Sequence, residues 1–256
     1  MIDARAIVSP QAQLAPDVTV GPFSIIGPLV QIGARTVIGP HVVVNGPTTI
    51  GEDNRIFQFA SIGDAPQDKK YRGEPTRLVI GDRNVFRESC TMNRGTTHDR
   101  GVTTIGNDNL FMAFSHVAHD CVIGNNTVFA NSVAMGGHVE VGDWAILGGL
   151  VAVHQFTKIG AHAFLGGGAI LSRDVPPYVM VAGNPAVPHG VNAEGLKRRG
   201  FSEEQVRHIR EAYRILYRSD LKLTEALERL STLAAERPEI RALVEFIHGS
   251  TRSLVR

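Results

Sequence analysis

The sequence has few cysteines, no long apolar run and almost no net charge, and each shortage excludes a class of protein. Its 256 residues include only two cysteines, Cys90 and Cys121, too few for a disulfide or zinc framework, and we expect both thiols to be buried and inert. No run of about eighteen apolar residues occurs, and the N-terminus lacks the basic and apolar segments of a secretory leader. We therefore expect a cytosolic, cytoplasmic protein with no transmembrane segment.

The charge is nearly balanced. Lysine and arginine number 26 against 25 aspartates and glutamates, which gives a formal net charge of +1, and we expect no nucleic-acid partner. Hydrophobic residues make up 43% of the chain, so it can bury an ample core as one long or two modest domains. This composition excludes a disordered protein.

What the sequence has in abundance is a repeat of six residues. A helix would repeat apolar residues every 3.6 positions and an ordinary strand every two, whereas a strict period of six indicates short strands that coil as a parallel β-helix. Three hexads, about eighteen residues, would close one triangular coil. The apolar positions are Val8, Leu14, Val20, Ile26, Ile32, Ile38, Val44, Ile50, Ile56 and Ile62, and then Ile105, Phe111, Val117, Ile123, Phe129, Met135, Val141, Leu147, Val153, Ile159, Leu165 and Leu171.

Two other positions of the hexad are restricted. The residue after the apolar one is often glycine, as at Gly33 and Gly51, which we interpret as a tight corner that needs unusual backbone angles. The fourth residue after the apolar one is usually small, so little volume is left inside the coil. Cys90 and Cys121 both occupy this position, in different corners.

Two segments interrupt the repeat. The first, residues 63–79, is charged and contains proline; it keeps the phase, so we expect it to replace one coil's worth of strands with a loop. The second, residues 93–104, leaves the repeat one residue out of phase. Because function concentrates on loops carried by a rigid scaffold, both are candidates for a site.

The solenoid is predicted to span residues 1–191, ending in a proline-rich linker at 174–191, and a helical C-terminal domain is predicted at 192–256. Ser202 followed by Gln205 is typical of a capping box that opens a helix. Further helices are expected from Thr224 and from Pro238, because proline is favoured in a first helical turn. The adjacent cations Lys197, Arg198 and Arg199 form either a solvated run or a phosphate-binding group.

Repeat arithmetic brings four of the ten histidines to one corner. Residues eighteen apart stack about 4.8 Å apart along the axis, so His119 aligns with Gly137 and Gln155, and Asp120 aligns with His138. The four histidines are His116, His119, His138 and His154. The other six, His98 among them, belong to no such cluster.

The cluster fits a general base better than a metal site. Gamma carbonic anhydrases, which are solenoid enzymes, bind zinc through two histidines five residues apart, and no two histidines here have that spacing. An imidazole held in one tautomer by a carboxylate such as Asp120 can take a proton from a hydroxyl group. Gly137, with no side chain at this level, leaves a backbone N–H free to meet an oxyanion.

These motifs resemble those of one enzyme family. The hexads, GEPTR after the first loop, AHDC around His119, AVHQF at 152–156, DVPPYV with GNPA, and EGLKRRGF at 194–201 are similar to the UDP-N-acetylglucosamine O-acyltransferases that open lipid A synthesis. The resemblance runs from Met1 to Arg256, although hexads and GNPA alone would indicate only a hexapeptide transferase. It implies an all-β solenoid, a left-handed parallel β-helix that departs from the usual right-handed crossover, followed by a small α-helical domain. It also implies a homotrimer with active sites between subunits.

The resemblance implies a reaction and a set of residues. A (3R)-3-hydroxyacyl group would pass from acyl carrier protein to the glucosamine 3-hydroxyl of UDP-N-acetylglucosamine, with no cofactor beyond the carrier's phosphopantetheine and no metal. His119 matches the general base, Asp120 its carboxylate partner, and Gly137 the oxyanion amide. The matching substrate-binding residues are Asp68, Lys70, His116, His138, His154, Gln155, Asn192, Glu194, Arg198 and Arg199. Gly167 matches the residue whose size limits acyl length, so we expect a preference for longer donors.

Several alternatives stay open. A solenoid transferase that uses coenzyme A is disfavoured by KRRGF and the helical tail, and a non-enzymatic ice-binding or scaffold solenoid by the lack of a Thr-x-Thr ladder. The sequence leaves undecided the preferred acyl length, the affinity for the carrier, and whether a 3-amino sugar nucleotide is the acceptor. It also leaves undecided whether Lys69 or Lys70 reaches the site.

Overall fold

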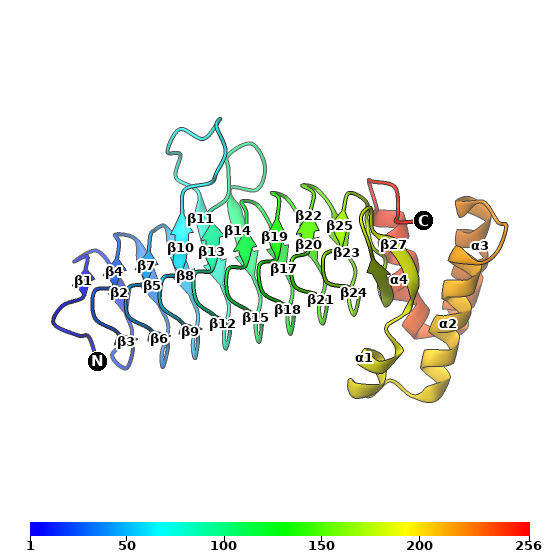
Figure 1. Cartoon of the computed structure of the whole chain (residues 1–256), viewed down its shortest axis with the longest axis horizontal. Helices are drawn as coiled ribbons and strands as arrows, with labels where there is room; N and C mark the ends of the chain where they lie inside the picture. The colour runs from blue at the N-terminus through cyan, green and yellow to red at the C-terminus, as the bar shows by residue number, and fades with distance from the viewer.

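The computed structural model describes residues 1–256 and shows an elongated three-sided solenoid with a helical cap at one end (Figure 1). The first sheet contains β1 (Ile7–Val8), β4 (Ile25–Ile26), β7 (Val43–Val44), β10 (Ser61–Asp64), β13 (Thr91–Asn93), β16 (His116–Val117), β19 (Ala134–Met135), β22 (Ala152–Val153) and β25 (Ile170–Leu171). The second contains β2 (Gln13–Leu14), β5 (Val30–Ile32), β8 (Thr48–Ile50), β11 (Arg77–Ile80), β14 (Val102–Ile105), β17 (Val122–Ile123), β20 (Glu140–Val141) and β23 (Lys158–Ile159). The third contains β3 (Thr19–Val20), β6 (Val37–Ile38), β9 (Arg55–Ile56), β12 (Val85–Phe86), β15 (Leu110–Phe111), β18 (Val128–Phe129), β21 (Ile146–Leu147), β24 (Phe164–Leu165), β26 (Val179–Ala182) and β27 (Val187–Val191).

The hexad repeat produces these sheets. Each strand pairs in parallel with the next strand of its own sheet, for example Ile32 with Ile50, eighteen residues on. The apolar hexad residues point inward, and Phe86, Phe111 and Phe129 stack through the core with ring centroids 5.0 and 4.7 Å apart. The predicted left-handed parallel β-helix is confirmed. Both cysteines are buried free thiols, as expected, and burial raises the pKa of Cys90 to about 11.

The interpretation of the hexad glycines was wrong. Most of them do not have positive φ; the left-handed position lies two residues later and is usually filled by another residue type, such as Arg35 with φ of 57°. The glycines are needed for a different reason: a Cβ on Gly33 would lie 2.7 Å from the backbone carbonyl of Gly51 in the next coil. Asp120 and His138 occupy the left-handed position with φ of 57° and 61°, so the fold places side chains at equivalent points of successive coils.

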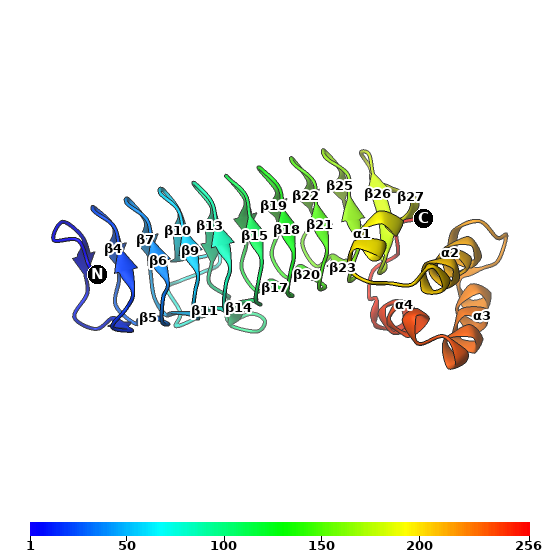
Figure 2. The ribbon, with the colours of Figure 1, turned by 90° about the horizontal axis from the view of Figure 1, so that it is seen from below.

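The two interruptions were also partly misread. Ile50 pairs with Ile80, and Ile80 with Ile105, so the register advances by thirty and then twenty-five residues instead of eighteen. The first loop is therefore a twelve-residue insertion and the second a seven-residue insertion, and neither replaces a coil's strands. Both leave the solenoid between the first and second sheets and lie side by side (Figures 1 and 2). We call this edge, which includes residues 118–121, 136–139 and 154–157, the loop corner.

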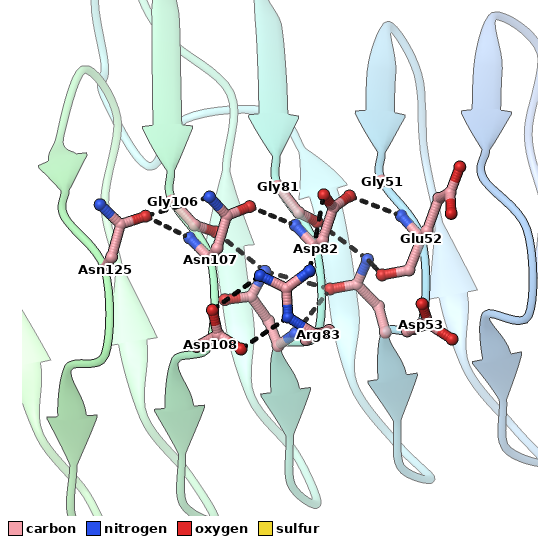
Figure 3. A network of polar contacts seen from close by, with 12 residues as sticks. Gly51, Glu52, Asp53, Gly81, Asp82, Arg83, Gly106, Asn107, Asp108 and Asn125 are labelled. Atoms are coloured by element: carbon pink, nitrogen blue, oxygen red, sulfur yellow. Dashed lines mark hydrogen bonds and ion pairs between the residues drawn. The ribbon is translucent and has the colours of Figure 1, made fainter.

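The edge between the second and third sheets is different. We call it the ladder corner; it includes residues 51–54, 81–84, 106–109, 124–127, 142–145 and 160–163. Side-chain oxygens on successive coils accept hydrogen bonds from backbone N–H groups, as from Asp82 N to Asn107 Oδ1 at 2.7 Å and from Asn107 N to Asn125 Oδ1 at 2.8 Å (Figure 3). Arg83 also bridges to Asp108 through two hydrogen bonds of 2.7 and 2.8 Å. These contacts fix the spacing of the coils without a loop.

Helices close the C-terminal end of the solenoid. They are α1 (Ala193–Arg198), α2 (Glu203–Tyr217), α3 (Leu223–Glu236) and α4 (Pro238–Gly249). The capping box is confirmed, since Ser202 Oγ accepts from Gln205 N and Gln205 Oε1 accepts from Ser202 N. The linker contains the antiparallel strands β26 and β27, and α3 begins one residue before the predicted position. None of the helices is both long and apolar enough to cross a membrane. The division into two domains at residue 191 stays a prediction.

Candidate active site

The loop corner carries a cleft of about 800 Å³ beneath the two inserted loops. Its walls come from three places: the first loop, the second loop, and the corner residues of three successive coils. The lining residues are Gln67, Asp68, Lys69, Lys70, Thr96, His98, Asp99, His119, His138, Gln155 and Phe156. Five of the predicted site residues therefore meet in one cleft, namely Asp68, Lys70, His119, His138 and Gln155.

His119 is held by the residues below and beside it. Its imidazole lies over Gly137, where an added Cβ would come within 2.5 Å of the ring. Nδ1 lies 2.9 Å from Asp120 Oδ2, and Nε2 has no hydrogen-bond partner in the chain. Because a carboxylate accepts only, Nδ1 carries the proton, and Nε2 is left as a free acceptor. The side chain keeps 15% of its surface exposed, so this acceptor can meet a substrate in the cleft.

Asp120 is buried and fully engaged. Its carboxylate accepts hydrogen bonds from Thr96 N at 2.9 Å and Thr96 Oγ1 at 2.6 Å in addition to that from His119. Burial would raise the pKa of Asp120, but the hydrogen bonds from His119 and Thr96 outweigh it and hold the pKa below its usual value. Asp120 therefore stays ionised and ties the second loop to the loop corner of the solenoid through Thr96.

A second histidine–carboxylate pair lies beside the first. His138 Nδ1 is 2.6 Å from Asp99 Oδ2 on the second loop, and its ring stacks on Phe156 at 4.3 Å. The His138 and His119 rings meet edge to face, with centroids 4.9 Å apart. The sequence reasoning missed Asp99, and it was wrong to leave His98 outside the cluster, since His98 lines the same cleft.

His116 and His154 flank this centre rather than line the cleft. His116 Nδ1 lies 2.7 Å from Thr91 Oγ1, and its pKa is lowered by burial and then by the nearby His119. His154 is exposed, and its Nδ1 lies 3.2 Å from an Arg252 guanidinium nitrogen on the C-terminal tail.

The first loop brings charge to the opposite wall. Asp68 Oδ1 accepts from Lys70 N at 2.9 Å, which turns the chain tightly at this point. Lys69 and Lys70 are both exposed and both line the cleft, so the question of which one reaches the substrate stays open.

Of the residues that match nucleotide contacts, Gln155 lines the cleft, whereas Asn192 and Arg199 lie at the ladder corner. Asn192 Nδ2 donates to the His162 carbonyl at 3.0 Å, and Arg199 lies 3.2 Å from His162 Nδ1 and 5.1 Å from the centre of the Trp144 ring. Burial lowers the pKa of Arg199, while burial and then the Arg199 charge lower the pKa of His162 to about 4. The neutral His162 ring thus stacks between the rings of Trp144 and Tyr178, and Arg199 contacts both His162 and Trp144.

The remaining predicted residues also stand apart from His119. Glu194 and Arg198 are exposed on α1 at the ladder-corner end. Gly167 is exposed between the third and first sheets, where a Cβ would lie 3.3 Å from the Gly149 carbonyl. Within one chain the structure thus brings His119 together with Asp68 and Lys70 of the first loop. It does not bring to His119 the residues Asn192, Glu194, Arg198, Arg199 or Gly167.

A metal-binding reading of the cleft meets a geometric obstacle. Potential ligand atoms of His119, Asp120 and His138 lie within 4.8 Å of one another. However, the Asp120 carboxylate already accepts from Thr96 and His119, so a metal would have to break the hydrogen bond that orients the imidazole.

Comparison with known proteins decides the family. Residues 174–255 match the family model "Udp N-acetylglucosamine O-acyltransferase; Domain 2", and residues 103–137 match "Bacterial transferase hexapeptide (six repeats)". The acyl-[acyl-carrier-protein]--UDP-N-acetylglucosamine O-acyltransferase of Thiobacillus denitrificans is 55% identical over 100% of this chain and 99% of its own length. The chain belongs to the UDP-N-acetylglucosamine O-acyltransferase family.

Solved structures agree with this assignment. The UDP-N-acetylglucosamine O-acyltransferase of Moraxella catarrhalis is 47% identical, covers 100% of this chain and 99% of its own, and superposes with a TM-score of 0.98. The Francisella novicida enzyme is 42% identical, with 100% and 94% coverage and a TM-score of 0.98. This member of the UDP-N-acetylglucosamine O-acyltransferase family is an acyltransferase, as the sequence predicts.

Proposed function

We propose that the protein transfers a (3R)-3-hydroxyacyl group from acyl carrier protein to the glucosamine 3-hydroxyl of UDP-N-acetylglucosamine, in the cytoplasm, as the first step of lipid A biosynthesis. The observation that carries the proposal is the His119–Asp120 pair, whose free Nε2 faces a cleft under two polar loops. The printed names of relatives more than half identical over their full length, which specify this carrier and this sugar nucleotide, support it.

The chemistry follows from the tautomer of His119. Nδ1 donates to Asp120, so Nε2 can remove the proton from the sugar 3-hydroxyl while its oxygen attacks the thioester carbonyl. The C–O bond forms as the carbonyl oxygen becomes an oxyanion, and the Gly137 N–H, which donates no hydrogen bond within the chain, is placed to stabilise it. Collapse of the intermediate breaks the C–S bond, and protonated His119 returns its proton to the departing phosphopantetheine thiolate. No group beyond the donor's own phosphopantetheine is needed.

The other cleft residues bind rather than react. Asp68 and His138 offer hydrogen-bonding groups to the sugar and acyl chain, Gln155 offers its amide to the nucleotide, and a first-loop lysine offers a cation to the phosphopantetheine phosphate. We assign supporting contacts to His116 and His154, which flank the same centre.

The active site requires more than one copy of the chain. If Asn192, Glu194 and Arg199 hold the nucleotide, and Arg198 and Gly167 the donor, they must reach His119 from neighbouring copies, because within a chain they lie at other corners. We propose a homotrimer, the cyclic arrangement in which each such junction repeats three times.

One substrate panel tests the proposal. Purified protein is incubated with hydroxyacyl carrier proteins or hydroxyacyl coenzyme A as donor, and with UDP-N-acetylglucosamine or its 3-amino analogue as acceptor, and products are measured by mass spectrometry. We expect efficient transfer only from the carrier protein to the 3-hydroxyl sugar. Preferred use of coenzyme A would make the protein another solenoid transferase, and preferred use of the amino sugar would change the acceptor.

A further inference from the structure

A half-buried arginine outside the cleft joins the first loop to the solenoid. Arg94 Nη1 donates to the carbonyl oxygens of Gly46 at 2.7 Å and Gly63 at 2.8 Å, and its Nη2 donates to the Tyr71 hydroxyl at 3.2 Å. Gly46 lies between β7 and β8, Gly63 lies in β10, the strand from which the loop departs, and Tyr71 lies within the loop. One side chain therefore holds the loop at its base and at its middle.

The chemistry of this contact suits arginine alone. Arg94 has no carboxylate partner: every acceptor is a neutral oxygen, and its buried Nε has no partner. Withdrawing a cation from water without a counter-ion costs free energy. Hydrogen bonds from the guanidinium to the three neutral oxygens offset this cost. The planar fork spans three acceptors at once, which the single ammonium of lysine does not reproduce.

Tyr71 passes this restraint to the substrate-facing residues. Its hydroxyl donates to the Glu74 carbonyl at 2.7 Å while it accepts from Arg94, and its backbone N–H donates to the Asp68 carbonyl at 3.1 Å. The side chain of Asp68 in turn accepts from Lys70 N. The position of the Asp68–Lys70 turn therefore depends on where the Tyr71 ring is held.

The same short segment also fixes the base. Asn93 Nδ2 donates to the Ala65 carbonyl and Arg94 N to the Asp64 carbonyl, both at 3.1 Å, which hold the start of the first loop. Two residues after Arg94, Thr96 donates to the Asp120 carboxylate that orients His119. Residues 93–96 thus connect the two walls of the cleft. The two loops leave the solenoid from neighbouring strands, β10 and β13 (Figure 1).

We propose that Arg94 and Tyr71 are positioning residues that hold the first loop at its working distance from His119. Neither touches the cleft, so they act through Asp68 and the adjacent lysines. The inference rests on the proposed function of the cleft, and it adds two residues to which neither the family motifs nor the repeat pointed.

The test uses two conservative variants with matched controls in the full-length protein. Arg94→Lys keeps the charge and removes the fork, and Tyr71→Phe removes only the hydroxyl. Arg87→Lys is the arginine control, because Arg87 is exposed and pairs with its half-buried neighbour Glu88 away from the cleft. Tyr213→Phe is the tyrosine control, because the Tyr213 hydroxyl has no hydrogen-bond partner to lose.

Trypsin reports the position of the loop without reference to catalysis. Lys69, Lys70 and Arg72 are exposed, and cleavage there requires the loop to open locally. We expect initial cleavage after these residues, identified by fragment mass, to accelerate about threefold in Tyr71→Phe and about tenfold or more in Arg94→Lys, since hydrogen bonds from a charged group are the stronger ones. The controls should match the parent protein.

Steady-state kinetics then separate positioning from folding. We expect the KM for UDP-N-acetylglucosamine to rise by about the same factors, and kcat to change less than about threefold, because the His119–Asp120 pair is intact. Unchanged cleavage in both variants would overturn the proposal, and so would faster cleavage with unchanged KM. A parent protein without transferase activity would overturn the proposed function instead, and it would leave the proteolysis result as a test of the restraint alone.

Discussion

The loop corner and the ladder corner are built from the same repeat and differ in what was added to it. At the ladder corner, side-chain oxygens on successive coils accept hydrogen bonds from the backbone in register (Figure 3). Aromatic rings follow at Trp144, His162 and Tyr178. At the loop corner two insertions break that regularity and enclose a cleft around His119. The same repeat therefore forms a regular hydrogen-bonded edge at the ladder corner and an edge with a cleft at the loop corner.

Electrostatics separate the two corners further. At the loop corner an ionised Asp120 supports a histidine that can accept a proton. At the ladder corner burial, and then the charge of Arg199, lower the pKa of His162 to about 4. This histidine therefore stays neutral near neutral pH. His162 occupies the left-handed corner position, as Asp120 and His138 do, whereas His119 precedes that position by one residue. Under the proposed function the loop corner would carry out the reaction and the ladder corner would hold the nucleotide.

The largest difference between the corners should appear on removing each histidine. His119→Ala should lose roughly 10² to 10⁴ in kcat, the usual contribution of a general base. His162→Ala should instead raise the KM for UDP-N-acetylglucosamine with a smaller loss of kcat. Both kinetic constants would be measured on protein whose folding is checked by circular dichroism. Equal losses of kcat in the two variants would remove the distinction.

Asp120→Asn should have a smaller effect than loss of the imidazole. An amide can donate to Nδ1, which would favour the tautomer with its proton on Nε2 and remove the free acceptor. We expect a loss in kcat of about tenfold to a hundredfold at neutral pH, with little change in KM. The measurement is the pH profile of kcat. A profile identical to that of the parent would show that Asp120 does not set the tautomer.

Cations from both corners, a first-loop lysine and Arg198, should serve the acyl carrier protein donor. A diphosphate sugar and an acidic carrier protein both bind through charge-assisted contacts, which salt weakens. We expect Arg198→Glu to raise the KM for the carrier about tenfold, with a similar trend in the parent as ionic strength rises. If neither substrate constant changed, the Lys197–Arg199 run would be only a solvated surface.

The smallest expected effect concerns a third place, Gly167. The exposed glycine leaves space beside Gly149, and if a neighbouring copy places the acyl chain there, the parent should prefer longer donors. Two extra buried methylenes at about 0.8 kcal/mol each would change the preference a little over tenfold. Gly167→Met should fill the space and reverse the order on a panel of donors. Equal rates on long and short donors in the parent would place the length-determining residue elsewhere.

The sequence predicts the regular parts of this molecule well because the repeat is itself a geometric rule. A period of six alone places the inward-facing apolar residues of the solenoid, both cysteines and the alignment of His119 over Gly137. The insertions obey no period, so their lengths were misjudged, and with them the residues that they carry to the cleft. His98, Asp99 and Thr96 would have been found by noticing that both loops leave from the edge that carries Asp120, one coil after the second loop.

The glycine misreading has a similar origin. Sequence reasoning treats a corner glycine as a requirement of its own backbone angles, yet Gly33 is needed because the next coil lies 2.7 Å from where its Cβ would be. Such a contact is between coils and is not visible in local sequence. Contacts between copies of the chain are equally invisible in local sequence. Arg199 and Gly167 lie far from His119 within one chain, because no single chain contains the complete proposed site.

The central claim, that the loop corner of one copy reacts with a nucleotide held by the ladder corner of another, is tested most directly by mixing two disabled subunits. His119→Ala and an Asn192→Ala/Arg199→Ala double variant would be co-expressed with different affinity tags, and mixed oligomers isolated through both tags. Each mixed trimer should contain one site that pairs an intact His119 with an intact Arg199 from a neighbour, so turnover of the isolated mixed trimers should recover to about a third of the parent value. Mixed oligomers no more active than either variant alone would contradict the account.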